Sequence, residues 1–143
     1  MKRIKYGTQK ISEADIEAVV GVLKNSNLTQ GQEIPSFEEE IDLRLGHDVH
    51  SVVLNSATSA LHVGYLSLGL GFGDLVWTSA NTFVATASAA RMCGADIDFV
   101  DIDEQSLNMD MRCLAAKLEH CVQQGDSLPD IVVPVRDRWI AQL

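Results

Sequence analysis

A polar turn at residues 55–59 has the residue types that bind phosphate groups. It follows an apolar stretch and precedes an expected helix, and Ser56, Thr58 and Ser59 supply hydroxyl groups. Free N–H groups at a helix N-terminus suit an anion, and small residues let the backbone approach it closely. A plain helix cap needs only one of these residues and, for this turn taken alone, is an equally good interpretation.

A second polar turn, at residues 78–82, follows the next expected strand and leads to Phe83 at the start of another expected helix. Ligands of parallel sheets bind beyond the carboxyl ends of the strands, so both turns belong to the same edge. A phosphate site beside an aromatic ring suits a flat phosphorylated cofactor. Taken alone, Phe83 is more typical of a core residue than of a cofactor contact.

The elements that must position these turns can be read from the periodicity of apolar residues. Expected helices cover residues 12–24, 35–45, 59–68, 82–92 and 110–120, and expected strands cover residues 51–54, 75–77, 97–100 and 131–135. The first of these strands is expected to be buried. From residue 51 strands and helices alternate strictly, which predicts an α/β fold with a mostly parallel sheet and right-handed crossovers.

Composition excludes several classes of function. The 143 residues are 46% hydrophobic and 22% charged, with a formal net charge of −9, which is typical of a globular protein and not of one that binds nucleic acid. No apolar run is long enough to cross a membrane, so we expect no membrane partner and a cytoplasmic location. The acidic residues between Asp96 and Glu104 lack the spacing of a calcium loop, and no metal site is expected.

Five ordered motifs extend these observations. They are Leu28–Gly31, Asn55–His62, Thr82–Thr86, Gly94–Ala95 and Phe99–Asp103. In this order the chain resembles the DegT/DnrJ/StrS family of sugar aminotransferases over roughly residues 4–135. Within the family the likeness is strongest to members that aminate C4 of a UDP-linked 4-keto-6-deoxy-N-acetylhexosamine during pseudaminic acid biosynthesis, a route to cell-surface polysaccharide.

The resemblance implies the N-terminal part of the large domain of a fold-type-I aminotransferase that uses pyridoxal 5'-phosphate. It implies transfer of an amino group, usually from glutamate, to a nucleotide-linked keto sugar, and a homodimer in the intact enzyme. By position, Thr58 and Ser59 would hold the phosphate, Ala57 would contribute its backbone, and Phe83 would stack on the pyridine ring. Thr29 and Gln30 are candidate sugar contacts, although an ordinary loop threonine explains Thr29 equally well.

The resemblance also implies that part of the machinery is missing from these 143 residues. We expect three regions: N-terminal helices with a substrate-side loop (1–48), a partial cofactor-binding domain (49–135), and a tail (136–143) that departs from the family, as a frameshift or deletion near the Val135 codon would produce. Family members place the Schiff-base lysine beyond this point, so no catalytic residue is assigned and the chain alone is expected to be inactive.

In the family's sheet the first strand lies beside the last one, so the expected strand 51–54 would lack a native neighbour here. Two other interpretations of the chain's function stay open. It could be a non-catalytic binding or dimerisation fragment, or a dehydratase-type member of the family that uses pyridoxamine phosphate.

Overall fold

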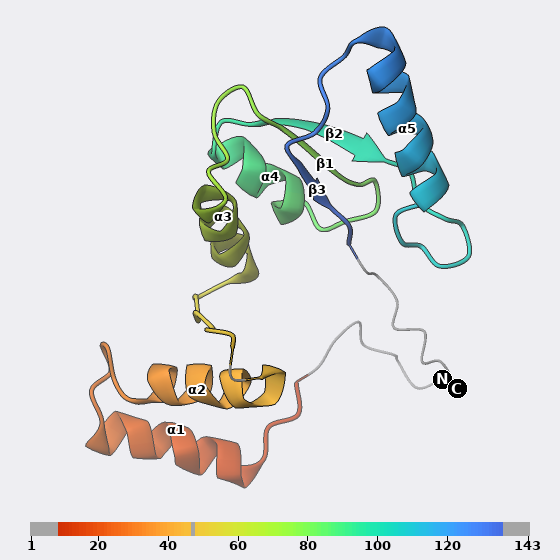
Figure 1. Ribbon diagram of the computed structural model, residues 1–143. Helices are drawn as coiled ribbons and strands as arrows, with labels where there is room; N and C mark the ends of the chain where they lie inside the picture. The colour runs from red at the N-terminus through yellow and green to blue at the C-terminus, as the bar shows by residue number, and fades with distance from the viewer. Residues whose placement is uncertain (1–8, 47, 136–143) are drawn as a thin grey trace. The chain divides into compact units, whose positions relative to one another are not determined.

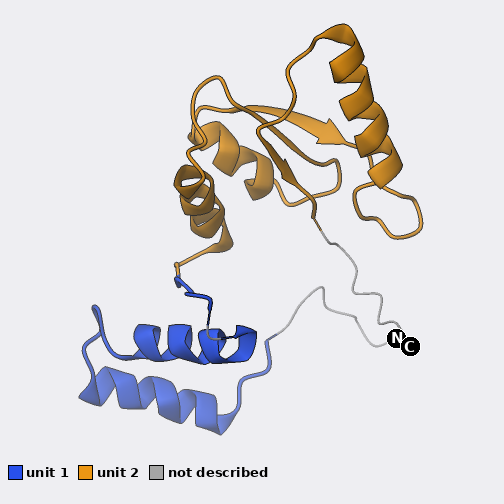
Figure 2. Ribbon diagram, viewed as in Figure 1, with its two compact units in different colours: residues 1–53 blue, residues 54–143 orange. Residues whose placement is uncertain are grey.

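The computed structural model describes residues 9–46 and 48–135, so the expected tail at 136–143 lies outside the described residues. The chain divides into two compact units, residues 1–53 and residues 54–143, which are described separately (Figure 2). No helix in the described ranges is long and apolar enough to cross a membrane.

Unit 1 is built from two helices, α1 (Glu13–Asn25) and α2 (Glu33–Leu45). The start of α1 is a capping box, because Ser12 Oγ accepts a hydrogen bond from the Asp15 N–H at 3.3 Å while the Asp15 carboxylate accepts one from the Ser12 N–H at 2.7 Å. Neither helix has a buried residue among those described, and apolar side chains such as Leu23 are largely exposed.

The prediction of a buried strand at residues 51–54 is wrong. These residues form no strand, and the Val52 side chain is 73% exposed. The Ser51 N–H donates to Asp42 Oδ1 at 2.7 Å, and the Val53 N–H donates to Glu38 Oε1 at 2.8 Å. A strand needs a neighbouring strand to satisfy its N–H groups, and here carboxylates of α2 satisfy two of them instead.

Unit 2 contains the sheet. Its elements are α3 (Ala57–Ser67), β1 (Leu75–Ser79), α4 (Ala85–Met92), β2 (Asp96–Val100), α5 (Met111–Gln124) and β3 (Ile131–Val133). The strands are parallel, in the order β2-β1-β3, with Val76 opposite both Ile97 and Ile131 (Figure 1). The expected α/β fold with a parallel sheet and flanking helices is confirmed.

Two buried clusters lie on the two faces of the central strand. Val76 packs on the side of α3 and α4 with Tyr65 and Ala89, whereas Trp77 packs with Met109 and with residues of α5. Successive side chains of a strand point to opposite faces, which explains why neighbours in sequence belong to different clusters. The core therefore fixes α3 and α4 against one face of the sheet and α5 against the other.

Candidate functional site

The 55–59 turn forms the N-terminal cap of α3. Ser56 Oγ accepts a hydrogen bond from the Ser59 N–H at 3.1 Å, and the Ser59 hydroxyl donates to Asn55 Oδ1 at 2.8 Å. The hydroxyl oxygens of Ser56 and Ser59 also lie 3.0 Å apart. The turn thus has the cap geometry that the alternative interpretation predicted, and the cap occupies both serine side chains.

The cap leaves donors that suit a phosphate. Ala57 and Thr58 are the first two residues of α3, so their N–H groups have no acceptor within the helix. Ala57 is exposed and Thr58 is half-buried, and the first turn of α3 carries no carboxylate that would repel an anion. Two backbone N–H groups and the Thr58 hydroxyl therefore fit a phosphate, whereas the Ser59 side chain would have to leave Asn55 to join them.

Phe83 lies just outside a helix. The expected helix at 82–92 begins only at Ala85, so Phe83 belongs to the turn before α4. The Phe83 ring is 76% exposed, which places it on the surface and not in the core. The Phe83 carbonyl accepts a hydrogen bond from the Thr86 N–H at 3.0 Å, so the first turn of α4 holds the backbone that carries the ring.

Both turns lie at the edge of the sheet where β1 ends. The chain leaves the end of β1 and reaches α4 after a short turn, so the start of α4 lies near that end of the strand. Figure 1 shows α3 and α4 beginning on the side toward which β3 runs. This edge is the one at which parallel sheets bind ligands, so the fold puts an anion-binding helix start and an exposed aromatic ring on the same side.

A buried hydrogen bond links these two helices. The Tyr65 hydroxyl of α3 donates to the Thr86 carbonyl of α4 at 2.9 Å, and the Thr86 and Thr82 hydroxyl oxygens lie 2.8 Å apart. Burial raises the pKa of the Tyr65 hydroxyl, which therefore keeps its proton and remains a donor. Sequence reasoning did not single out Tyr65, because its partner is 21 residues away and no local motif marks the pair.

The candidate sugar contacts belong to unit 1. Thr29 and Gln30 are both exposed, and Gln30 has a φ of 54°, in the left-handed region that residues other than glycine rarely adopt. At Gly31 an added Cβ would lie 2.1 Å from the Asn27 carbonyl oxygen. Gln30 lines a polar hollow of about 490 Å³, whose other lining residues are Lys24, Asn25, Ser26, Asn27, Gly31 and Gln32.

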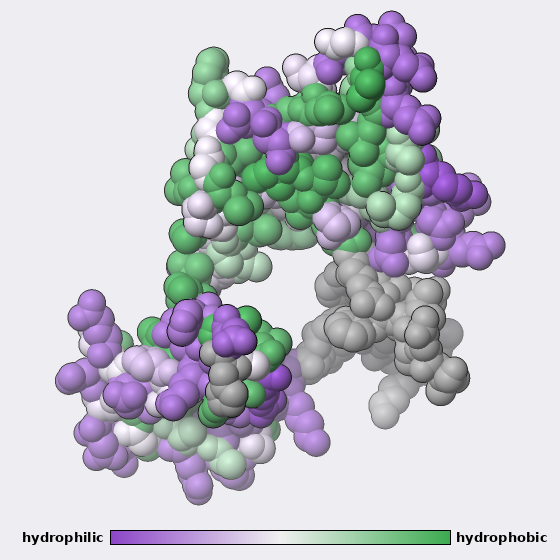
Figure 3. Space-filling model, in the orientation of Figure 1, coloured by the Kyte–Doolittle hydropathy of each residue, from purple (hydrophilic) through white to green (hydrophobic). Residues whose placement is uncertain are grey.

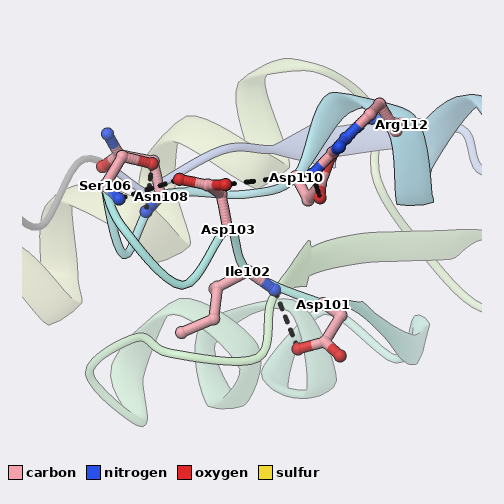
Figure 4. Close-up of polar contacts among 7 residues, drawn as sticks. All are labelled: Asp101, Ile102, Asp103, Ser106, Asn108, Asp110 and Arg112. Carbon is pink, nitrogen blue, oxygen red and sulfur yellow. Dashed lines mark hydrogen bonds and ion pairs between the residues drawn. The ribbon is translucent and has the colours of Figure 1, made fainter.

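The acidic loop after β2 makes local contacts. The Asp103 carboxylate accepts a hydrogen bond from the Ser106 N–H at 2.8 Å, and Asp110 caps α5 by accepting one from the Arg112 N–H at 2.8 Å (Figure 4). Hydrogen bonds from the Arg112 side chain and N–H lower the pKa of Asp110 to about 2. Among the described residues, no three His, Cys, Asp or Glu side chains are grouped as a metal ion would require.

Comparison with known proteins places these features in context. The sequence model of the DegT/DnrJ/EryC1/StrS aminotransferase family matches residues 9–124. The UDP-4-amino-4,6-dideoxy-N-acetyl-beta-L-altrosamine transaminase of Campylobacter jejuni (strain 81-176) is 43% identical over 115 residues, which are 80% of this chain and 30% of that enzyme. The spore coat polysaccharide biosynthesis protein SpsC of Bacillus subtilis (strain 168) is 36% identical over 107 residues, or 75% of this chain and 27% of that protein.

Solved structures agree with the sequence comparisons. A putative sugar aminotransferase from Streptococcus pneumoniae in its PLP form has a TM-score of 0.74 and 32% identity, covering 80% of this chain and 29% of that one. The same enzyme in its PMP form gives the same values. A DegT/DnrJ/EryC1/StrS aminotransferase from Brucella abortus has a TM-score of 0.69 and 30% identity over 85% of this chain. The described sheet and helices are thus part of a fold-type-I aminotransferase fold.

Proposed function

Because the chain belongs to the DegT/DnrJ/EryC1/StrS aminotransferase family, whose cofactor is pyridoxal phosphate, we propose that it carries the phosphate-binding part of a nucleotide-sugar aminotransferase. The proposed substrate is a nucleotide-linked 4-keto-6-deoxy sugar, and the proposed amino donor is glutamate. The observation that carries the proposal is the family match over residues 9–124. This range includes both the Ala57 and Thr58 N–H groups, which have no acceptor within α3, and the exposed ring of Phe83.

Each residue of the proposed site has a separate role. The N–H groups of Ala57 and Thr58 and the Thr58 hydroxyl bind the phosphate, with Ser59 joining them if its hydroxyl leaves Asn55. Phe83 covers one face of the pyridine ring and keeps water from it. When bound, pyridoxal phosphate takes up an amino group from the donor and delivers it to the keto carbon of the sugar.

The sugar and the assembly belong to the same proposal. The relative from Campylobacter jejuni is named as a transaminase of a UDP-linked amino sugar, which supports a UDP-linked keto sugar of the pseudaminic acid route as substrate. We assign Thr29 and Gln30 to its recognition, since amide and hydroxyl groups suit sugar hydroxyls. The proposed active form is a cytoplasmic homodimer of the intact enzyme.

These 143 residues are proposed to bind the cofactor without catalysing transfer. The chain spans 30% of the length of the Campylobacter jejuni relative. The resemblance implies that the Schiff-base lysine belongs to a later part of the family's sequence than the motifs matched here. We expect the purified chain to show no aminotransferase turnover with glutamate and a UDP-linked 4-keto sugar. Turnover that disappears when Lys10, Lys24 or Lys117 is replaced by arginine would contradict this.

A binding experiment tests the site. Pyridoxamine 5'-phosphate is the better probe because its amine does not condense with surface lysines, and its binding can be followed by calorimetry. We expect Thr58→Val and Phe83→Leu each to weaken binding about tenfold, the loss expected for a charge-assisted hydrogen bond or an aromatic contact. Phe72→Leu is the matched control, since Phe72 is 98% exposed on a different turn. Equal affinity in all four proteins would disprove the site.

One observation favours a second function. An apolar hollow of about 560 Å³ lies between α3 and β3, lined by Ala57, Ala60, Leu61, Gly64, Tyr65, Ser67, Leu68, Ile131 and Val133. Figure 3 shows apolar surface over α3 and the adjacent sheet. In the described part of the chain, β3 pairs on one side only, with β1. The chain would then be a binding module that joins a separate polypeptide carrying the rest of the sheet.

Co-expression separates this function from the first. The partner in the experiment is the C-terminal part of the Campylobacter jejuni relative, carrying an affinity tag. A binding module would be retained by that tag, and Gly64→Trp, which places a large ring in the hollow where a Cβ meets no atom within 4 Å, would abolish retention. A wild-type chain that passes through unretained would rule the binding module out.

A further inference from the structure

The exposed ring of Phe83 has little packing to hold it. With 76% of its surface exposed, the side chain depends on its backbone for position. That backbone is held through Thr86, whose N–H donates to the Phe83 carbonyl at 3.0 Å. Val84, which precedes α4, provides no side-chain cap, so the turn lacks the usual means of fixing a helix start.

Thr86 is in turn held from another helix. It is 6% exposed, and its carbonyl accepts a hydrogen bond from the hydroxyl of Tyr65, which is 4% exposed. The Thr86 hydroxyl also pairs with that of Thr82, the residue before Phe83. The contacts therefore run from α3 through Tyr65 to Thr86, and from there to both Phe83 and its neighbour.

We propose that Tyr65 is a positioning residue that ties the ring of Phe83 to the helix whose N-terminus binds the phosphate. This rests on the proposed function, because the two ends of the link are the proposed ring contact and the proposed phosphate contact. Tyr65 lies two turns along α3 from Thr58, so a single rigid helix carries both the phosphate donors and the hydroxyl that holds the Phe83 turn. A short linker joins the phosphate to the ring of the cofactor, so a site with both contacts tied to one helix is already preorganised.

Tyr65→Phe tests the link, because it removes only the hydroxyl and keeps the buried ring. Thr78→Val is the matched control: it also removes a buried hydroxyl that donates to a backbone carbonyl, that of Val133 at 3.0 Å, but this bond joins β1 to β3. In the cofactor-free chain we expect the Thr86 amide to exchange with solvent about three- to tenfold faster in Tyr65→Phe than in wild type or in Thr78→Val.

The second measurement uses pyridoxamine 5'-phosphate. We expect Tyr65→Phe to bind it about three- to tenfold more weakly and to change the circular dichroism that the saturated protein induces in the cofactor, since this signal reports how the ring is held. If Tyr65 only stabilised the fold, Tyr65→Phe would lower the stability of the protein and leave the saturated signal unchanged. An unchanged saturated signal would overturn the positioning role alone, as would unchanged exchange of the Thr86 amide. A wild-type chain that fails to bind the probe would overturn the proposed function and this role with it.

Discussion

At the scale of single residues, Gly31 decides whether the loop beside the proposed sugar site can form. An added Cβ would lie 2.1 Å from the Asn27 carbonyl oxygen, so Gly31→Ala must displace the loop and is expected to destabilise unit 1 by about 1–3 kcal/mol. Gly21→Ala is the control, because a Cβ there meets no atom within 4 Å and alanine favours the helix by about 0.5–1 kcal/mol. In thermal unfolding followed by circular dichroism, we expect a midpoint below that of wild type for Gly31→Ala and above it for Gly21→Ala. Equal midpoints in the two variants would contradict the steric argument.

At the scale of elements, the start of α5 gives the chain a defined acid sensitivity. The pKa of Asp110 in the folded chain is about 2, below its ordinary value of 3.8, so its contribution to stability is complete above 3.8 and is lost as the pH falls toward 2. Asp110→Asn keeps an oxygen that accepts from the Arg112 N–H but has no charge to titrate. Urea unfolding at a series of pH values should show a shallower acid loss in this variant than in wild type or in Glu119→Gln, an exposed change on α5. Parallel curves for all three would refute the assignment.

At the scale of the whole molecule, the two units should differ in stability. Unit 2 has two buried clusters around β1, whereas α1 and α2 bury no residue within the described part of unit 1. Amides open locally where few apolar contacts hold them, so hydrogen exchange should be fast throughout α1 and α2 and slowest in β1. Residue-resolved exchange measures this directly. Protection of the α1 amides as strong as that of Val76 and Thr78 would contradict this prediction, because it would mean that another surface covers the helices.

Much of the local structure and the family could be predicted from the sequence. The Ser12 and Asp15 capping box, the alternation of strands and helices after residue 51, and the order of motifs around Ser59 and Phe83 are encoded by neighbouring residues. Caps and apolar periodicity act over a few residues, so they can be read without knowing the fold. The α/β class, the family and its cofactor followed from them, whereas the roles assigned to Thr29, Gln30, Thr58, Ser59 and Phe83 stay predictions.

Some features were decided only by the tertiary structure, because they depend on residues that are far apart in the sequence. Residues 51–54 have the composition of a buried strand, yet they form none, since a strand exists only where another strand pairs with it. The Phe83 turn is held by Tyr65 of another helix, which donates to the carbonyl of Thr86, 21 residues away in the sequence. Sequence by itself thus determined most of the helices and strands and the chemistry that they resemble. Tertiary structure alone decided that residues 51–54 form no strand and that Tyr65 holds the Phe83 turn, because folding brings together groups that are far apart in the sequence.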